Sequence, residues 1–156
     1  MTSLEGERVL TLMDDLTSVL MYGKRDRIGQ LWRIESNGCL RNKEIGAIGR
    51  CLTIDGSHAH KDHVYMDWYN GQDNQHWEFT IDHYIMSKLR GDGIIFNHLV
   101  LDVIWSDSQP LVTNGAQVHA IKKDFTASQK WKMKPCRGIF CATPTENNPL
   151  ELNSID

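Results

Sequence analysis

The sequence predicts one all-β domain made of three equivalent units. The pattern Gln-x-Trp occurs at Gln30, Gln75 and Gln129, which is a period of roughly fifty residues. A short apolar segment precedes each pattern by about twenty residues, at positions 8–12, 50–54 and 99–103. Self-similarity at this period is typical of folds assembled from repeated supersecondary units. The three units therefore predict a threefold pseudo-symmetric β fold.

Each unit carries an apolar first strand, a second strand, and a third strand that begins with tryptophan. In the third strands apolar and charged residues alternate, which is the pattern of a half-buried strand. Asn37-Gly38 and Asp82-His83 follow two of these strands and predict hairpins into a fourth strand. The second strands are predicted to start at Val19, Val64 and Val118.

The tryptophans Trp32, Trp77 and Trp131 are predicted to occupy equivalent core positions, because each begins a strand in the same context. Burial of such a ring contributes several kcal/mol to stability. The glutamine two residues earlier can satisfy backbone groups where the chain turns into the strand. Residues 135–156 lie beyond the last repeat and contain three of the four prolines. We therefore expect the domain to span residues 1–134 and an irregular extension to span residues 135–156.

Composition excludes several classes of function. The chain has 156 residues and a formal net charge of -3, with no long run of either sign, so a nucleic-acid surface is not expected. It has no apolar run of the roughly 18 residues that a membrane span needs, and its N-terminus lacks the apolar segment of a secretory signal. Without an Asn-x-Ser/Thr acceptor either, the sequence favours a protein that is cytoplasmic or released without a signal peptide.

The four cysteines are expected to be unpaired and partly buried thiols. A chain of this length has no need of disulfides to staple an undersized core. Cys136 and Cys141 have four residues between them, unlike a redox Cys-x-x-Cys pair, which leaves a local disulfide or two thiols open. The other two cysteines are Cys39 and Cys51.

The three repeats resemble the ricin B-type (R-type) β-trefoil lectin family over roughly residues 5–134. The segment VYMDWYNGQDNQHW, at positions 64–77, carries the family's pattern of Val, an aromatic residue, Asn-Gly and Asn-Gln-x-Trp. The resemblance implies a β-trefoil, which is a six-stranded barrel capped by three hairpins. It also implies a non-enzymatic module that binds glycans or glycoproteins of the galactose or N-acetylgalactosamine type, as a single chain or a homo-oligomer.

The resemblance also assigns candidate sugar contacts. In that family an Asp ends the first strand, an aromatic residue of the second strand stacks on the sugar, and an Asn precedes Gln-x-Trp. In the first unit these positions hold Thr11, Tyr22 and Gly29, so Tyr22 supplies the platform, and Asp14 or Asp15 can substitute for the acidic residue if the first loop bends back.

The second unit is the best predicted pocket, and the third unit keeps only its acidic residue. In the second unit the strict acidic and aromatic positions hold Thr53 and Asp67, with Asp55 and Trp68 close to them, and Asn70, Asn74 and Gln75 match the family pattern. Asp55, Trp68, Asn70 and Asn74 converge if the strand carries a small register change. In the third unit Asp102 matches, while Ile121 and Ser128 replace the aromatic residue and the Asn. Asp102 is either a sugar acceptor or a carboxylate that caps a turn.

Other readings of the sequence compete with the lectin. His58, His60, Asp62 and His63 form either a solvated loop, which we favour, or a metal site. Trp105 is either a second stacking platform or covered hydrophobic surface. No motif for catalysis or a cofactor is present, so neither enzymatic activity nor a cofactor or bound metal is expected. The alternative function is a trefoil without sugar binding, which contacts a protein partner through its loops or its C-terminal segment.

Overall fold

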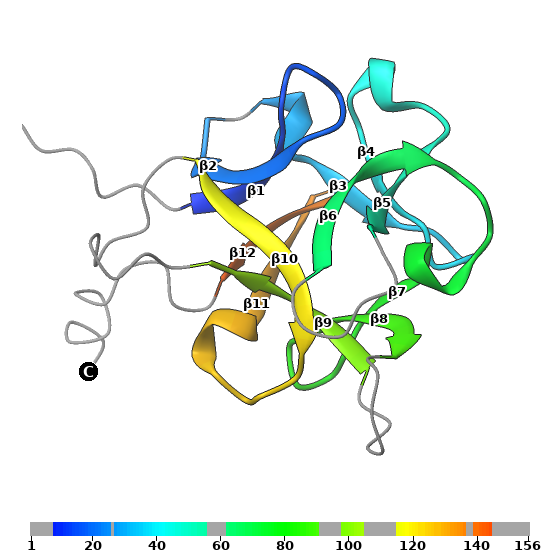
Figure 1. The fold of residues 1–156 in the computed structure, drawn as a ribbon. Helices are drawn as coiled ribbons and strands as arrows, with labels where there is room; N and C mark the ends of the chain where they lie inside the picture. Colours follow the sequence, from blue (N-terminus) through cyan, green and yellow to red (C-terminus); the bar gives the residue numbers. More distant parts are fainter. Residues whose placement is uncertain are drawn as a thin grey trace, which may run out of the picture.

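The computed structural model describes residues 8–25, 27–55, 62–90, 98–104, 115–136 and 139–144. Within these residues the chain forms β-strands and four short 3-10 helices (Figure 1). None of these helices is long and apolar enough to cross a membrane, and that statement covers the described residues alone. The strands are β1 (Arg8–Leu12), β2 (Val19–Gly23), β3 (Trp32–Ile34), β4 (Leu40–Asn42), β5 (Arg50–Ile54), β6 (Asp62–Trp68), β7 (Trp77–Phe79), β8 (Ile85–Arg90), β9 (His98–Val103), β10 (Ala116–Lys122), β11 (Trp131–Cys136) and β12 (Ile139–Pro144).

The strands repeat one pattern of two antiparallel hairpins three times. In each unit the first strand pairs with the second, as β1 with β2, β5 with β6 and β9 with β10. The third strand pairs with the fourth, as β3 with β4, β7 with β8 and β11 with β12. A 3-10 helix ending in Gln30, Gln75 or Gln129 precedes each Trp strand. This arrangement is the predicted β-trefoil, and the predicted fold class is confirmed.

The three repeat tryptophans form the centre of the core, as predicted. Each indole is buried, and each Nε1–H donates a hydrogen bond to a backbone carbonyl of the first strand in the same unit. The bond joins a large apolar ring to the strand that it packs against, so the ring's polar edge is satisfied inside the core. The pairs are Trp32 with Leu10 (3.0 Å), Trp77 with Leu52 (2.8 Å) and Trp131 with Leu101 (3.0 Å).

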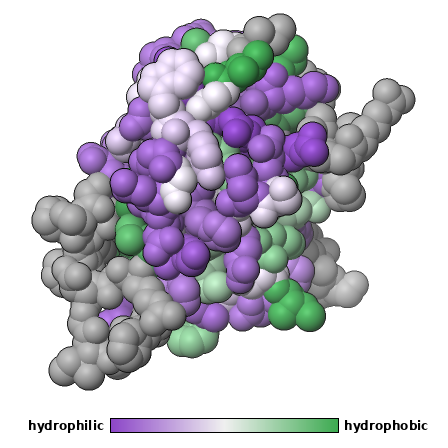
Figure 2. All heavy atoms as spheres, turned by 90° about the vertical axis from the view of Figure 1, so that its right-hand side faces the viewer, coloured by the Kyte–Doolittle hydropathy of each residue, from purple (hydrophilic) through white to green (hydrophobic). Residues whose placement is uncertain are grey.

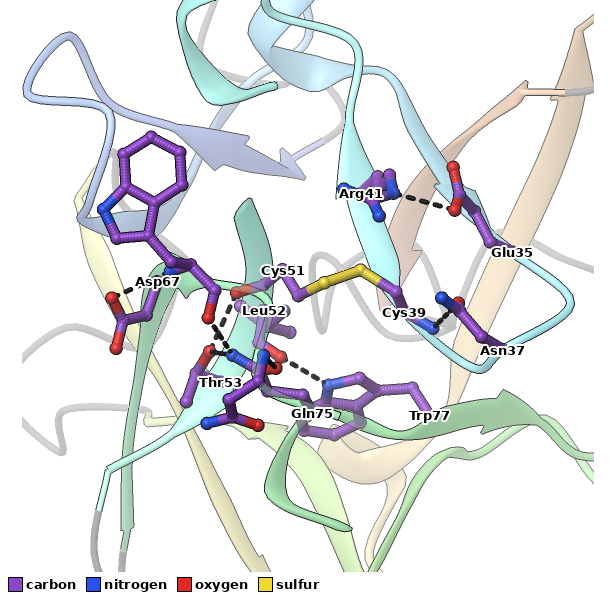
Figure 3. Close-up of a disulfide and its surroundings, with 12 residues drawn as sticks. Glu35, Asn37, Cys39, Arg41, Cys51, Leu52, Thr53, Asp67, Gln75 and Trp77 are labelled. Carbon is purple, nitrogen blue, oxygen red and sulfur yellow. Dashed lines mark hydrogen bonds and ion pairs between the residues drawn. A yellow bond between two sulfur atoms is a disulfide. The ribbon is translucent and has the colours of Figure 1, made fainter. Parts of the chain in front are cut away.

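The glutamine of each repeat is a buried structural bracket. Gln75 shows the pattern: its Nε2 donates to Thr53 Oγ1 at 2.9 Å and to the Trp68 carbonyl at 2.8 Å (Figure 3). Its Oε1 accepts the Asn70 backbone N–H at 2.7 Å. Gln30 and Gln129 make the equivalent three bonds in their own units. The amide therefore ties the end of the second strand and the following loop to the first strand, which confirms the predicted backbone role.

The predicted irregular extension is wrong for residues 139–144. These residues form β12, which pairs with β11 over its whole length and with β3 at Phe140 and Trp32. Thr143 Oγ1 also donates to the Arg8 carbonyl at 2.6 Å. The strand is needed because a third unit without it would leave the backbone groups of β11 and β3 unpaired. Residues 145–156 lie outside the described part of the chain.

The expectation of unpaired thiols is wrong for two cysteines. Cys39, at the start of the β4 segment, forms a disulfide with Cys51 of β5 (Figure 3). Both side chains are completely buried, and the bond joins the last strand of the first unit to the first strand of the second. The side chain of Cys136 lies outside the described residues.

Candidate functional site

The position expected to hold the acidic sugar contact is buried in all three units. Thr11, Thr53 and Asp102 each lie near the end of a first strand and each accepts a hydrogen bond from the unit's buried glutamine. Asp102 is 7% exposed; its Oδ2 is 3.4 Å from Gln129 Nε2 and 3.9 Å from His119 Nε2. Its Oδ1 is buried without a hydrogen-bond partner among the described residues, so the carboxylate caps no turn there. The structure therefore gives Asp102 an internal role in place of a surface one.

The predicted second-unit pocket does not assemble around Asp55 and Trp68. The pairing of β5 with β6 is regular from Arg50 opposite Trp68 to Ile54 opposite Val64, without the register change that convergence required. The Asp55 backbone N–H bonds the His63 carbonyl at 2.8 Å, at the far end of this ladder. Five residues separate His63 from Trp68 on one strand, which is roughly 16 Å. The carboxylate and the indole therefore belong to different surfaces.

The remaining predicted residues of the second unit divide between these two ends. Asn74 Nδ2 donates to the Ile54 carbonyl at 3.1 Å, beside Asp55, and Asn74 Oδ1 is buried without a partner among the described residues. Asn70 lies beside Trp68, where its Oδ1 accepts the Gln72 backbone N–H at 2.8 Å. Gln75 is buried, and its side-chain amide makes the three hydrogen bonds described above. These contacts give Asn70 and Gln75 structural roles.

Trp68 is a solvent-facing aromatic side chain. The indole is 60% exposed, and the Arg50 guanidinium carbon lies 4.9 Å from its ring centroid. Tyr69 and Ile48 are also exposed. They lie near each other, because the Tyr69 backbone N–H donates to the carbonyl of Gly49, the residue after Ile48, at 3.0 Å. We call Ile48, Trp68 and Tyr69 the Trp68 surface.

Among the described residues, the first unit contains a hollow with the dimensions of a small-ligand site. Two adjoining depressions, of about 500 and 100 Å³, share Thr11, Leu12, Met13, Asp14 and Arg27. Ligand pockets commonly have volumes of about 300–1000 Å³, so the pair is large enough for a sugar residue. The smaller depression is also lined by Tyr22, Arg25 and Gln30, and the larger by Leu16, Ile28, Gly29 and Glu44. We call the two together the first-unit hollow.

The hollow brings two predicted residues together. Tyr22 is half-buried on β2, and Asp14 lies in the connection between β1 and β2, so this loop bends back as the substitution required. Gly29 stands where the second unit has Asn74, and the Leu12 backbone passes close to it, because a Cβ on Gly29 would lie 3.0 Å from the Leu12 carbonyl oxygen. Sequence reasoning missed Arg25 and Arg27, although their position shortly after Tyr22 on the same segment was an available signal.

Asp15 holds the loop that carries Asp14. Its Oδ1 accepts the backbone N–H groups of Thr17 and Ser18, at 2.9 and 2.8 Å, and its Oδ2 accepts the Ser18 hydroxyl at 2.6 Å. The Ser18 hydroxyl, followed by these backbone groups, lowers the pKa of Asp15 below its usual value. Asp15 is therefore a turn residue, and Asp14 is the carboxylate that faces the hollow.

The depressed pKa of Asp15 predicts a pH dependence of stability. Its contribution is fully present above the pKa of the unfolded chain, at about 3.9, and is lost as pH falls through the lower folded pKa. We expect the free energy of unfolding to fall more steeply in the wild type than in Asp15→Asn below roughly pH 4. Chemical denaturation at stepped pH measures both slopes. Asp14→Asn, which removes none of the three bonds, should keep the wild-type slope, and equal slopes for Asp15→Asn would contradict the assignment.

The predicted histidine loop is only partly described. His58, His60 and Trp105 lie outside the described residues, whereas His63 is exposed at the start of β6. In the part of the chain that the structure describes, no cluster of three or more His, Cys, Asp and Glu side chains is arranged to hold a metal ion. The metal reading therefore has no geometric support in these residues.

Comparison with known proteins agrees with the architecture. A family model described as ricin-type beta-trefoil lectin domain matches residues 7–131. A search of curated proteins gives no match. The matched family is a carbohydrate-binding fold that is generally non-enzymatic. Because the match covers most of the chain and the three-unit fold agrees with it, this protein belongs to the ricin-type β-trefoil lectin domain family.

Proposed function

We propose that the chain is a non-enzymatic lectin module that binds galactose- or N-acetylgalactosamine-type glycans, and that the first-unit hollow is its working site. One observation carries the proposal: Tyr22, Asp14 and Arg27 line the same concave surface. An aromatic face stacks on the apolar face of a sugar ring, while a carboxylate and a guanidinium supply convergent hydrogen bonds. These are the ingredients that a shallow sugar site needs.

A single site of this kind binds weakly. A monosaccharide buries little area, and each hydroxyl must exchange its water for a protein partner. Useful avidity requires several sites on one ligand-bound assembly, through a homo-oligomer or a multivalent glycan. The proposal therefore includes glycoproteins or clustered glycans as partners.

Tyr22→Ala tests the site. We expect about a tenfold or greater loss of affinity for galactose-type glycans, because the stacking face is lost. Isothermal titration calorimetry with methyl galactoside and methyl N-acetylgalactosaminide measures the loss, and thermal melting checks the fold. Tyr69→Ala is the matched control, since this exposed tyrosine lies on the Trp68 surface and should leave binding unchanged. A folded Tyr22→Ala protein with wild-type affinity would remove the first-unit hollow from the proposal.

A second candidate function is favoured by the Trp68 surface. Ile48, Trp68 and Tyr69 form an exposed apolar and aromatic group, which is typical of a protein contact. Figure 2 shows the face on the right of Figure 1, where hydrophilic residues cover most of the surface and hydrophobic residues form small separate patches. Because the described residues on this face form no extended hydrophobic surface, we rank the protein contact second. The order would be reversed by a protein partner that remains bound in the presence of free galactose and that no longer binds the Trp68→Ala variant.

A further inference from the structure

Two neutral polar side chains of the first-unit hollow, those of Thr11 and Gln30, are already hydrogen-bonded within the fold. The Thr11 hydroxyl is buried, donates to the Val9 carbonyl at 2.9 Å and accepts from Gln30 Nε2 at 3.2 Å. Gln30 also donates to the Gly23 carbonyl at 2.8 Å, and its Oε1 accepts the Arg25 backbone N–H at 2.9 Å. The side chains at the base of the hollow are thus committed to the fold. Recognition falls to the charged groups around the rim.

Two guanidinium groups line the smaller depression against one carboxylate. Arg27 Nη2 is 3.7 Å from Asp14 Oδ1, and the two side chains are 59% and 97% exposed. An exposed pair at this distance contributes little, so water or a ligand can replace it readily. Arg25 has no ion-pair partner among the described residues. The charged side chains that are described around the smaller depression are therefore two guanidinium groups and one carboxylate, which give its lining a net positive charge.

Comparison of the three units shows that Arg25 is not needed by the scaffold. The residues at this position are Arg25, Asn70 and Asp124, because each donates its backbone N–H to the bracket glutamine of its unit. Asn70 and Asp124 also use a side-chain oxygen to cap the next turn, at Gln72 and Thr126. A guanidinium has no acceptor and cannot make that bond. The first unit thus gives up a turn cap and gains a cation at the edge of a hollow.

The larger depression has the opposite character. Asp14 and Glu44 line it together with Arg27, so two carboxylates and one guanidinium border this depression. The Asp14 side chain is 97% exposed and its carboxylate oxygens can accept bonds from sugar hydroxyls. Tyr22 and Arg25 line the smaller depression, whereas Asp14 and Arg27 line both depressions. A ligand that occupies both therefore meets the Asp14 carboxylate, the Tyr22 ring and the two guanidinium groups.

We propose that the first-unit hollow is specific for a galactose-type sugar that carries an anionic group, a carboxylate or a sulfate, bound by Arg25 with Arg27. This inference rests on the proposed function and names the class of glycan that the site selects. Guanidinium groups bind carboxylate and sulfate-like oxygens through paired, charge-assisted hydrogen bonds. Ring hydroxyls face Asp14, and the anionic group faces Arg25 beside Tyr22.

Three ligands that share one ring test the proposal: methyl galactoside, methyl galacturonoside and methyl galactoside 6-sulfate. They differ at carbon 6 alone, so the two charged ligands also separate carboxylate from sulfate as the source of the anion. We expect the full chain to bind at least one charged ligand about tenfold or more tightly than the neutral one, with an advantage that shrinks at high salt. Arg25→Gln should abolish the advantage, and its backbone bond to Gln30 is untouched by the change. Arg33→Gln removes one exposed arginine elsewhere, on β3, and should preserve the advantage.

The outcomes separate this inference from the proposed function. Equal affinity for charged and neutral ligands overturns the anionic specificity and leaves a lectin for neutral galactose. A preference for the charged ligands that persists in Arg25→Gln overturns the role of Arg25. Absence of binding by all three ligands and by methyl N-acetylgalactosaminide, from protein with a normal melting transition, overturns the site and the lectin function together.

Discussion

Replacing Trp77 with alanine is expected to lower the free energy of unfolding by about 3–5 kcal/mol. The indole is 1% exposed and its Nε1–H donates to the Leu52 carbonyl at 2.8 Å. The substitution leaves a cavity in the core and also leaves a buried carbonyl without its donor. Equilibrium denaturation, followed by circular dichroism and fitted with a common m value, measures the change.

Trp68→Ala is the matched control for this experiment. It removes the same side chain from the same unit, at a position where the indole is 60% exposed. Surface substitutions usually change stability by less than about 0.5 kcal/mol, although the loss of the Arg50 contact adds a little here. If Trp77→Ala and Trp68→Ala unfolded at the same denaturant concentration, the repeat tryptophans would not be core residues.

Most strands of this fold were predictable because all three units bury a tryptophan at the same place and satisfy the same polar groups around it. A ring such as Trp77 has to be buried, its N–H needs an acceptor, and Gln75 has to satisfy the loop before it. Each requirement leaves a residue type at a fixed offset in the sequence. The predicted starts of β3, β7 and β11 at the tryptophans therefore agree with the structure.

Strand β12 was not predicted because the strands that it pairs with, and not its own residues, determine that it forms. Pro135 and Pro144 stand near the two ends of the last hairpin, and proline cannot donate to a strand ladder. The local composition thus favoured irregular structure. What makes residues 139–144 a strand is the unpaired edges of β11 and β3, which only the assembled barrel presents.

The candidate site was predictable in its residue types and not in its geometry. Tyr22 and Asp14 were identified, and the structure places both beside one hollow. Asp55 and Trp68 were assigned to one pocket because they stand close to the family's acidic and aromatic positions in the second unit, yet they lie at opposite ends of the β5–β6 ladder. The hydrogen-bond register of two strands decides which side chains lie next to each other. The sequence indicates this register only through the alternation that marks one face of the strand as apolar.

Removal of the Cys39–Cys51 disulfide is expected to lower the free energy of unfolding by about 3 kcal/mol. The bond closes a loop with a sequence separation of 12, and a loop near this length restricts the unfolded chain by about that amount. The Cys39→Ala/Cys51→Ala double variant, denatured without reductant, gives the value directly. Its m value should also rise, since the unfolded chain is released from a cross-link and exposes more surface. Cys141→Ala is the control for the loss of a cysteine elsewhere.

The loss of stability should be concentrated at the border between the first and second units, because the disulfide joins only these two units. Cys39 and Tyr84 occupy equivalent hairpin positions, since their carbonyls accept the same turn bonds, from Glu35 and Thr80. At the second border the Lys123 ammonium lies 4.2 Å from the Tyr84 ring centroid, and that contact is untouched by the double variant. Amide hydrogen exchange should therefore quicken in β4 and β5 before β8 and β9. Unchanged stability, or an equal rise in the exchange rates at both borders, would show that the disulfide does not hold the first two units together.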